Sequence, residues 1–156
     1  MDVFERITEL LEGNAAGFRV MEHEPVRTSE QAARVRGTPL EQGAKALVLK
    51  AGDEFVMVVI SAAVKVDFGK LRAYLGGGKV RFATPEEVAE RTGCQPGGVP
   101  PFGNLFGLRV IVDPTLTEHE RIDFNAGERT KSVDMRTEDY LRIVSPEIVD
   151  VGSRRP

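Results

Sequence analysis

The chain has 156 residues, of which 41% are hydrophobic and 29% charged, values typical of one globular domain and unlike those of a disordered or fibrous protein. No apolar run approaches the roughly 20 residues that cross a bilayer, and the net charge of −3 argues against a protein that coats nucleic acid nonspecifically. One cysteine, two distant histidines and a start unlike a secretory signal predict a cytoplasmic protein with no disulfide, metal site or membrane partner.

In the first half of the chain, hydrophobic periodicity predicts an alternation of helices and strands. Apolar residues recur at helical spacing across residues 3–11, and residues 18–22 alternate as in a short strand. Residues 28–37 predict a helix that a threonine can cap. The β-rich runs 46–49 and 55–60 are separated by a short turn, so the simplest interpretation is a central hairpin.

The second half continues this mixture. Asp67 begins a helical stretch that the glycines at 76–78 end, and Thr84-Pro85-Glu86-Glu87 is typical of a helix start. The order of elements predicts one mixed α/β or α+β domain over residues 1–156. The remaining expected elements are strands at 80–82, 108–112, 122–125 and 132–135 and a closing helix at 137–143.

A proline- and glycine-rich segment at residues 93–103 interrupts this pattern. Its three prolines lack a backbone donor and its four glycines permit unusual dihedrals, so we expect a long, specialised loop. Backbone N–H groups at Gly97 and Gly98 could form a preorganised oxyanion site beside the rigid Pro100-Pro101 pair. An ordered structural connection is an equally good interpretation of the same residues.

Ionisable residues give weaker signals. Neither histidine lies in a pattern typical of a catalytic triad, and the sequence contains no phosphate-binding loop or dinucleotide fingerprint. His23 is more typical of a structural turn, His119 of the surface, and Cys94 of a small buried side chain. Lys45 precedes an apolar run and suits a phosphate or a developing negative charge, although an ordinary solvated lysine fits the pattern as well.

Charge is segregated along the chain. Residues 65–81 contain five basic residues and one acidic residue, Asp67, which permits a polyanionic partner. A run of this kind is more often a solvated face than a docking patch.

Six short sequence motifs, in this order along the chain, resemble those of the YbaK/prolyl-tRNA-synthetase-associated editing family. The resemblance implies a compact mixed α/β fold in which a curved, barrel-like sheet surrounds an aminoacyl pocket. The motifs are His23-Glu24-Pro25 with Thr28-Ser29-Glu30, Gly43-Ala44-Lys45-Ala46-Leu47-Val48, Thr92-Gly93-Cys94, Gly97-Gly98-Val99-Pro100-Pro101-Phe102, Phe124-Asn125-Ala126-Gly127 and Thr137-Glu138-Asp139-Tyr140-Leu141.

The same resemblance implies the site. Lys45 matches the functional lysine of the family, and residues 97–101 match its Gly-x-x-x-Pro pocket loop. The implied mechanism has backbone amides that orient an ester, a lysine that holds the terminal phosphate or nucleotide, and substrate hydroxyls that assist attack by water. The predicted catalytic residues are Lys45, Gly97 and Gly98. The predicted substrate-binding residues are Thr28, Val99, Pro100, Pro101, Asn125, Gly127 and Ser132.

The resemblance further implies a free-standing deacylase that hydrolyses mischarged aminoacyl-tRNA in trans. We expect alanine, serine, threonine or cysteine on tRNA-Pro or a related tRNA, a synthetase as a second partner, and neither cofactor nor DNA. Some family members have histidine shortly after Asn-Ala-Gly, where this chain has residues 128–132, which leaves amino-acid specificity open. Two alternatives remain: a module that binds aminoacyl-tRNA or a synthetase without hydrolysis, and an esterase for small molecules.

Overall fold

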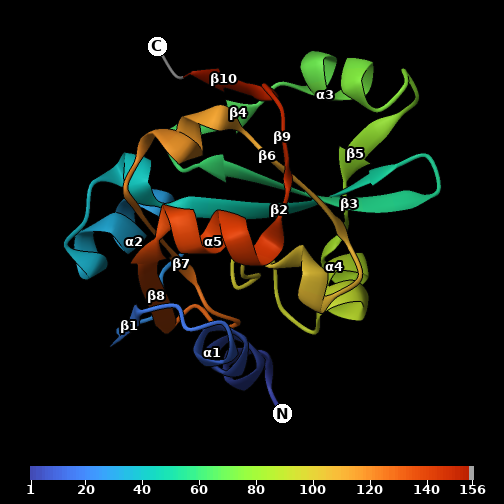
Figure 1. Cartoon of the computed structure of the whole chain (residues 1–156). Helices are drawn as coiled ribbons and strands as arrows, with labels where there is room; N and C mark the ends of the chain where they lie inside the picture. The colour runs from blue at the N-terminus through green and yellow to red at the C-terminus, as the bar shows by residue number, and fades with distance from the viewer. Residues whose placement is uncertain (155–156) are drawn as a thin grey trace.

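The computed structural model describes residues 1–154, in which a five-stranded and a three-stranded sheet share one hydrophobic core (Figure 1). The helices are α1 (Val3–Gly13), α2 (Ser29–Arg36), α3 (Phe68–Tyr74), α4 (Pro85–Thr92) and α5 (Thr137–Val144), with short 3-10 turns at Leu40–Gln42, Gly103–Leu105 and Pro114–Glu118. The strands are β1 (Phe18–Glu22), β2 (Ala44–Ala51), β3 (Glu54–Ser61), β4 (Val64–Val66), β5 (Val80–Phe82), β6 (Arg109–Val112), β7 (Arg121–Asn125), β8 (Lys131–Arg136), β9 (Glu147–Ile148) and β10 (Gly152–Arg154).

The five-stranded sheet has the order β5-β2-β3-β6-β9. The predicted central hairpin is confirmed, because β2 and β3 pair antiparallel over their whole length, whereas β6 runs parallel to β3. Side chains on both faces of β3 are buried, among them Met57 on one face and Val58 on the other. This double burial explains why residues 55–60 form a continuous apolar run rather than an alternating one.

The smaller sheet has the order β1-β8-β7 and is antiparallel throughout. An isolated bridge between Gly43, just before β2, and Asp123 of β7 connects the three-stranded sheet to the five-stranded sheet. β4 pairs with β10 in a separate two-stranded ladder. The ladders of residues 1–154 therefore do not close into one barrel, and the expected barrel-like sheet is not confirmed, whereas the mixed α/β class is.

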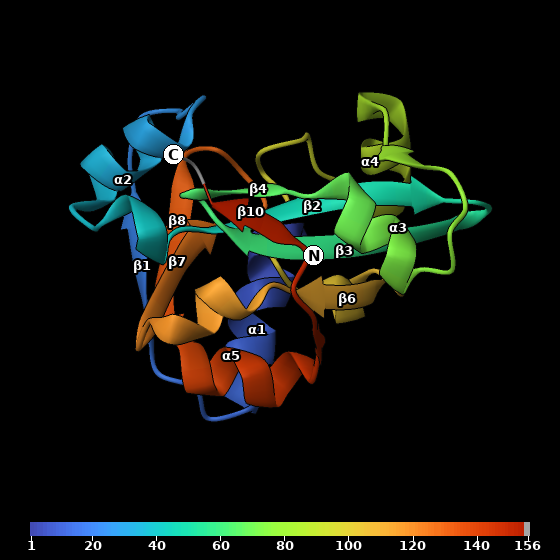
Figure 2. The ribbon, with the colours of Figure 1, turned by 90° about the horizontal axis from the view of Figure 1, so that it is seen from above.

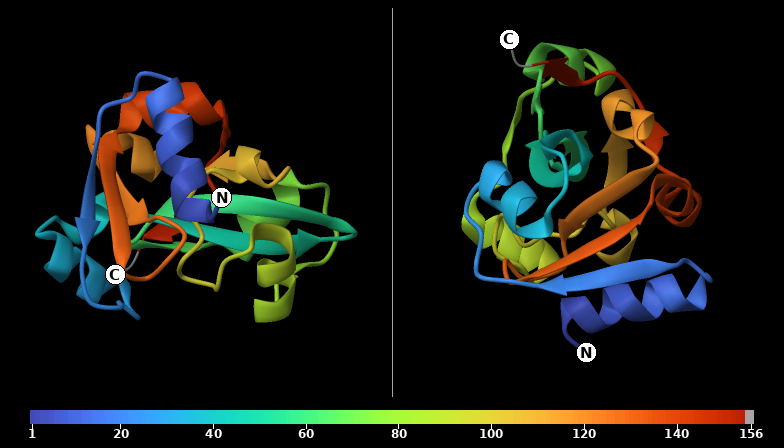
Figure 3. Two further views of the ribbon diagram at one scale, coloured as in Figure 1. Left: turned by 90° about the horizontal axis from the view of Figure 1, so that it is seen from below. Right: turned by 90° about the vertical axis from the view of Figure 1, so that its left-hand side faces the viewer.

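The core lies where the two sheets, α1 and α5 meet. Phe102 contacts both Phe124 of β7 and Tyr140 of α5, with ring centroids 5.4 Å and 5.2 Å apart in edge-on geometry. α1 packs against the three-stranded sheet through Ile7 and Leu11, which are fully buried (Figure 3). A second, smaller cluster on the other face of the five-stranded sheet is covered by α3 and the C-terminal segment. Within residues 1–154, no helix has the length and apolar character needed to cross a membrane.

Local sequence signals explain where α2, which borders the candidate site, begins and ends. The Thr28 hydroxyl accepts a hydrogen bond from the Gln31 N–H at 3.1 Å, so the threonine caps α2 as predicted. Gly37 ends the helix with φ of 69°, a left-handed conformation that glycine adopts without strain. In Figure 2, α2 and the three-stranded sheet lie at one end of the long β2–β3 hairpin, whereas α3 and α4 lie toward its other end.

Candidate functional site

A pocket of about 300 Å³ lies where α2, the start of β2, the end of β7 and the proline- and glycine-rich loop meet. Five of the predicted site residues line it, although they come from four separate segments of the chain: Thr28, Lys45, Gly97, Val99 and Asn125. The fold therefore gathers half of the predicted site around one cavity.

Small side chains form much of the pocket wall. Ala32 and Ala33 of α2 face it from one side, and Ala44 and Ala46 of β2 and Ala62 face it from the other. Methyl groups leave room for a small ligand group and offer it apolar contact. A pocket with this lining can accommodate the side chain of a small amino acid.

The remaining predicted residues lie behind the wall and do not line the pocket. Gly98 is buried, its N–H donates to the Gln95 carbonyl at 2.9 Å, and its own carbonyl accepts from the Gly127 N–H at 2.8 Å. The expectation that the Gly98 amide meets an ester therefore does not fit this geometry, because the amide is already engaged within the loop. Gly98 and Gly127 instead hold the loop against the turn that follows β7.

The two prolines anchor the other end of this loop. Pro100 and Pro101 are both buried, and the Tyr140 hydroxyl donates to the Pro101 carbonyl at 2.6 Å. Burial raises the pKa of Tyr140 above its ordinary value, so the hydroxyl keeps its proton and remains a donor. The contact ties the pocket loop directly to the aromatic cluster of the core.

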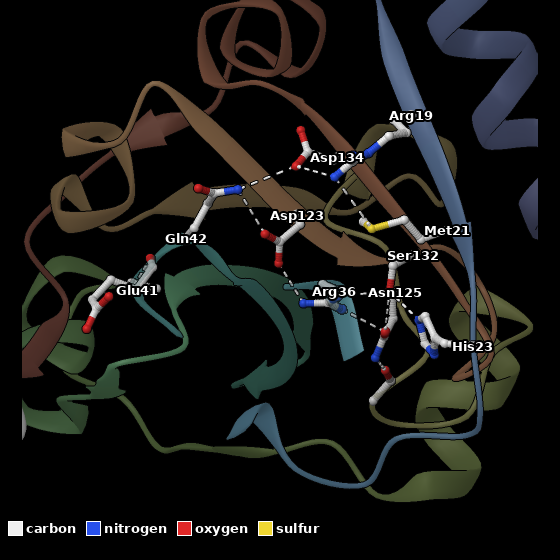
Figure 4. A network of polar contacts seen from close by, with 12 residues as sticks. Arg19, Met21, His23, Arg36, Glu41, Gln42, Asp123, Asn125, Ser132 and Asp134 are labelled. Atoms are coloured by element: carbon white, nitrogen blue, oxygen red, sulfur yellow. Dashed lines mark hydrogen bonds and ion pairs between the residues drawn. The ribbon is translucent and has the colours of Figure 1, made fainter. Parts of the chain in front are cut away.

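A polar network, drawn in Figure 4, borders the pocket through Arg36, Asp123 and Asn125. Arg36 donates through Nε to the Ser132 hydroxyl at 2.8 Å, through one terminal nitrogen to Asp123 at 2.7 Å, and through the other to the Asn125 side-chain oxygen at 2.8 Å. The Asn125 amide nitrogen then donates to the Gly97 carbonyl at 2.5 Å. Ser132, predicted to bind substrate, is fully buried in this network and contributes to support.

His23 extends the network toward the surface. Its Nδ1 lies 2.8 Å from the Glu24 carbonyl and its Nε2 lies 2.7 Å from the Ser132 hydroxyl. A carbonyl can only accept, so Nδ1 carries the proton in the neutral ring and Nε2 accepts from Ser132. This arrangement is that of a structural histidine at a turn.

Burial acts on both members of the ion pair in this network. Arg36 and Asp123 expose 6% and 1% of their side chains. Desolvation lowers the pKa of Arg36 and raises that of Asp123, while their mutual attraction opposes both changes. Gln42 donates a further hydrogen bond to Asp123 at 3.0 Å, so the carboxylate is held by more than one donor.

Neither Arg36 nor Asp123 was among the predicted site residues. Asp123 stands between the buried Ile122 and Phe124 in β7, and an acidic residue in a buried strand was the available signal. Arg36 gave no comparable signal, because a basic residue in the last turn of a helix is ordinary.

The pocket lining is cationic. It includes Lys45, Arg27 and Arg129, and the buried Asp123 is opposed by Arg36. Arg129 also donates to the Pro96 carbonyl at 2.9 Å, which places a guanidinium against the pocket loop. This balance of charge favours an anionic ligand such as a phosphate. Among residues 1–154, the histidine, cysteine and acidic side chains form no group of three that could hold a metal ion.

Comparison with known proteins agrees with this geometry. Residues 23–143 match the sequence model of the aminoacyl-tRNA editing domain. The chain is 42% identical over 151 residues to the multifunctional Ser/Thr-tRNA deacylase ProXp-y of Escherichia coli, covering 94% of this chain and 90% of that protein. It is 33% identical over 96 residues to the proline–tRNA ligase of Thermosipho melanesiensis, covering 61% of this chain and 17% of the ligase. A crystal structure of a candidate trans-editing enzyme for prolyl-tRNA synthetase superposes with a TM-score of 0.87 at 28% identity, covering 98% of both chains.

Proposed function

The chain belongs to the aminoacyl-tRNA editing domain family, and from this premise we propose that it is a free-standing aminoacyl-tRNA deacylase that removes small, wrongly attached amino acids in trans. The observation that carries the proposal is the convergence of Thr28, Lys45, Gly97, Val99 and Asn125 on one small pocket with a cationic lining. Residues 1–156 act as one editing domain in this proposal, and the site of action is the cytoplasm.

The reaction needs little from the protein beyond positioning. The oxygen of a water molecule bonds to the ester carbonyl carbon, the bond to the ribose oxygen breaks, and the ribose leaves as a hydroxyl with a proton from the water. The amino acid departs as a carboxylate and releases one proton. Because the ester lies beside a second ribose hydroxyl, orientation of water and stabilisation of the oxyanion supply the rate without a side-chain nucleophile.

Backbone amides of the pocket loop are the proposed oxyanion donors. Within residues 1–154, the N–H groups of Gly97 and Val99 take part in no hydrogen bond, and both residues line the pocket. Gly98 contributes by locking the peptide between them, since its N–H and carbonyl are both engaged. The catalytic assignment therefore remains with this loop, with contact through Gly97 and Val99 and support through Gly98.

Side chains of the cationic lining hold the nucleotide in this proposal. Lys45 binds the terminal phosphate or orients the terminal nucleotide, and Arg129 lines the same pocket. Thr28 and Asn125, which also line the cavity, contact the aminoacyl group in this proposal. The alanine wall supports serine, threonine, alanine or cysteine as the hydrolysed residue, and serine and threonine are the amino acids in the name of the Escherichia coli relative.

The tRNA partner is proposed from the relatives. Because related segments occur in proline–tRNA ligases, tRNA-Pro or a related tRNA is the proposed carrier, with a prolyl-tRNA synthetase as a second partner.

A panel of charged tRNAs tests the proposal. The protein is incubated with tRNA carrying alanine, serine, threonine, cysteine or proline, and the remaining ester is measured over time against a protein-free control. Accelerated loss of at least one small amino acid, with correctly charged prolyl-tRNA spared, is expected. Saturable binding without ester loss would indicate a binding module instead. Equal cleavage of free aminoacyl esters would indicate a small-molecule esterase.

A further inference from the structure

Arg36 occupies an unusual position for a charged residue, because it lines the pocket and yet is almost fully buried. It is the last helical residue of α2 and exposes 6% of its side chain. Placing a guanidinium there is costly unless each donor finds an acceptor.

All three of its bonded nitrogens have acceptors on one small area of the three-stranded sheet. Asp123 and Asn125 are two residues apart in β7, so their side chains leave the same face of the strand. Ser132 is the cross-strand partner of Asn125 in β8. The planar fork of Arg36 therefore matches three acceptors at fixed spacing, which a single lysine ammonium does not reproduce.

This contact fixes the orientation of the Asn125 amide. A guanidinium can only donate, so the Asn125 oxygen faces Arg36 and the amide nitrogen faces the opposite way. There the nitrogen donates to the Gly97 carbonyl at 2.5 Å. A continuous chain of contacts thus runs from the end of α2, through Asn125, to the pocket loop.

We infer that Arg36 is a positioning residue that sets the pocket wall by acting through Asn125 on Gly97. The inference rests on the proposed deacylase function for its catalytic consequence, but its structural part does not. With Arg36 in place, the Gly97 carbonyl is held toward β7, and the neighbouring amides of the loop keep their direction toward the cavity. The opposite wall of that cavity is α2 itself, so one residue fixes the spacing of both walls.

Two isosteric or charge-preserving variants separate this role from simple stability. Arg36→Lys keeps a positive charge opposite Asp123 but cannot serve all three acceptors. Asn125→Asp keeps an oxygen for Arg36 but replaces the donor to Gly97 with an acceptor. Arg121→Lys is the matched control, because Arg121 also pairs with a buried aspartate of this sheet, Asp134 at 2.5 Å, and does not line the pocket.

Hydrogen–deuterium exchange of the unliganded protein tests the structural part. Amides of residues 95–102 should exchange faster in Arg36→Lys and in Asn125→Asp than in the parent, while Arg121→Lys should match the parent there. Unchanged exchange in both pocket variants would overturn the inference. This measurement stands even if the parent hydrolyses no charged tRNA, an outcome that would remove the proposed function alone.

Kinetics test the functional part. Each pocket variant should lose about tenfold or more in kcat/KM for the preferred small substrate, since each breaks one hydrogen bond of the chain that runs from Arg36 through Asn125 to Gly97. The preference for that substrate over prolyl-tRNA should fall as well, which a loss of folded protein alone would not cause. If Arg36 acts through Asn125, the double variant should lose about as much as the worse single variant. Losses that multiply, or parental selectivity in Arg36→Lys, would contradict the inference.

Discussion

Lys45 and Lys50 lie on the same strand, five residues apart, and therefore leave opposite faces of β2. Lys45 lines the pocket, whereas Lys50 lines a separate groove and lies 5.7 Å from the Phe55 ring centroid. We expect Lys45→Ala to lower deacylation by about tenfold or more, because a cation at the nucleotide site is lost. Lys50→Ala, the matched control, should leave kcat unchanged. Steady-state kinetics check both, and equal activity of Lys45→Ala and the parent would defeat the assignment.

Gly98 tests whether the backbone of the loop matters. A Cβ added there would lie 3.2 Å from the Gly127 carbonyl oxygen and 3.4 Å from that of Gln95, so Gly98→Val should displace the loop. We expect strongly reduced turnover in a protein that still folds.

Cys94→Ala is the control for that substitution. Cys94 is buried and does not line the pocket, and burial raises the pKa of its thiol, which disfavours the thiolate. The deacylase activity of Cys94→Ala should stay close to that of the parent. The reverse pattern, an active Gly98→Val and an inactive Cys94→Ala, would indicate a covalent thiol route.

Among single residues, the sequence predicted those site residues that belong to the family motifs. Thr28, Lys45 and Asn125 belong to such motifs and do line the pocket. Asp123 carried a local signal, an acidic residue in a buried strand, but its pairing with Arg36, 87 positions away, is encoded by no local pattern. The engaged amide of Gly98 could not be foreseen either, since a glycine's hydrogen bonds depend on how its loop folds.

Among the elements, β6 and β9 are joined by a surface ion pair whose strength depends on pH. Arg109 donates to both carboxylate oxygens of Glu147, at 2.5 Å and 2.7 Å, and Tyr74 donates to the same group. The hydrogen bonds from Arg109 lower the pKa of Glu147 to about 2. A carboxyl group whose pKa is lower in the folded state stabilises the fold above its unfolded pKa, and this contribution is lost as the pH falls from about 4.5 toward 2.

Glu147→Gln should therefore destabilise the protein at pH 6 by about 1 kcal/mol or less, because the pair is partly exposed to solvent. At pH 3 the difference between the variant and the parent should shrink. Urea unfolding of both proteins at the two pH values measures it. A difference that stays the same or grows at pH 3 would show that the ion pair is not its source.

The helices were the elements most open to prediction, because their ends carry chemical signals. The Thr84 capping box begins α4 and the left-handed Gly93 ends it, at the positions that the sequence indicated. The short strands β4, β9 and β10 were not predicted. Each has two or three residues and exists through pairing with a distant segment, so periodicity has too few positions to act on.

Across the whole molecule, three of the five basic residues of the segment 65–81 gather at one groove. Arg72, Lys79 and Arg81 line a groove together with Lys50, at the part of the β2–β3 hairpin away from the start of β2. Lys70 does not line this groove and instead donates to Asp150 and to the Gly152 carbonyl. The groove residues, rather than the whole run, therefore form the surface suited to tRNA phosphates.

Neutralising the groove should weaken tRNA binding and flatten its dependence on salt. The triple variant Lys50→Gln, Arg72→Gln and Lys79→Gln removes three cations, so the slope of log affinity against log salt should fall by roughly 2 to 3. Lys70→Gln is the matched control and should keep the parental slope. Binding titrations at several salt concentrations measure both, and an unchanged slope in the triple variant would make this groove a solvated face.

The arrangement of the sheets was the least predictable feature of the molecule. The mixed α/β class followed from the order of elements, but no sequence signal indicated whether the two ladders join at their edge. In the structure, the isolated Gly43–Asp123 bridge lies between them. That contact lies beside the pocket, since both residues line it.

Hydrolysis of seryl-tRNA by the parent and by a variant with a narrowed pocket tests the central claim most directly. Ala33 lines the pocket from α2, and leucine is a good helix former, so Ala33→Leu should narrow the cavity without disturbing the helix. The account predicts rapid loss of the ester with the parent, a loss slower by about tenfold or more with Ala33→Leu, and similar unfolding temperatures for the two proteins. Equal rates in the parent and in Ala33→Leu would contradict it, because the ester would then be hydrolysed somewhere other than this pocket.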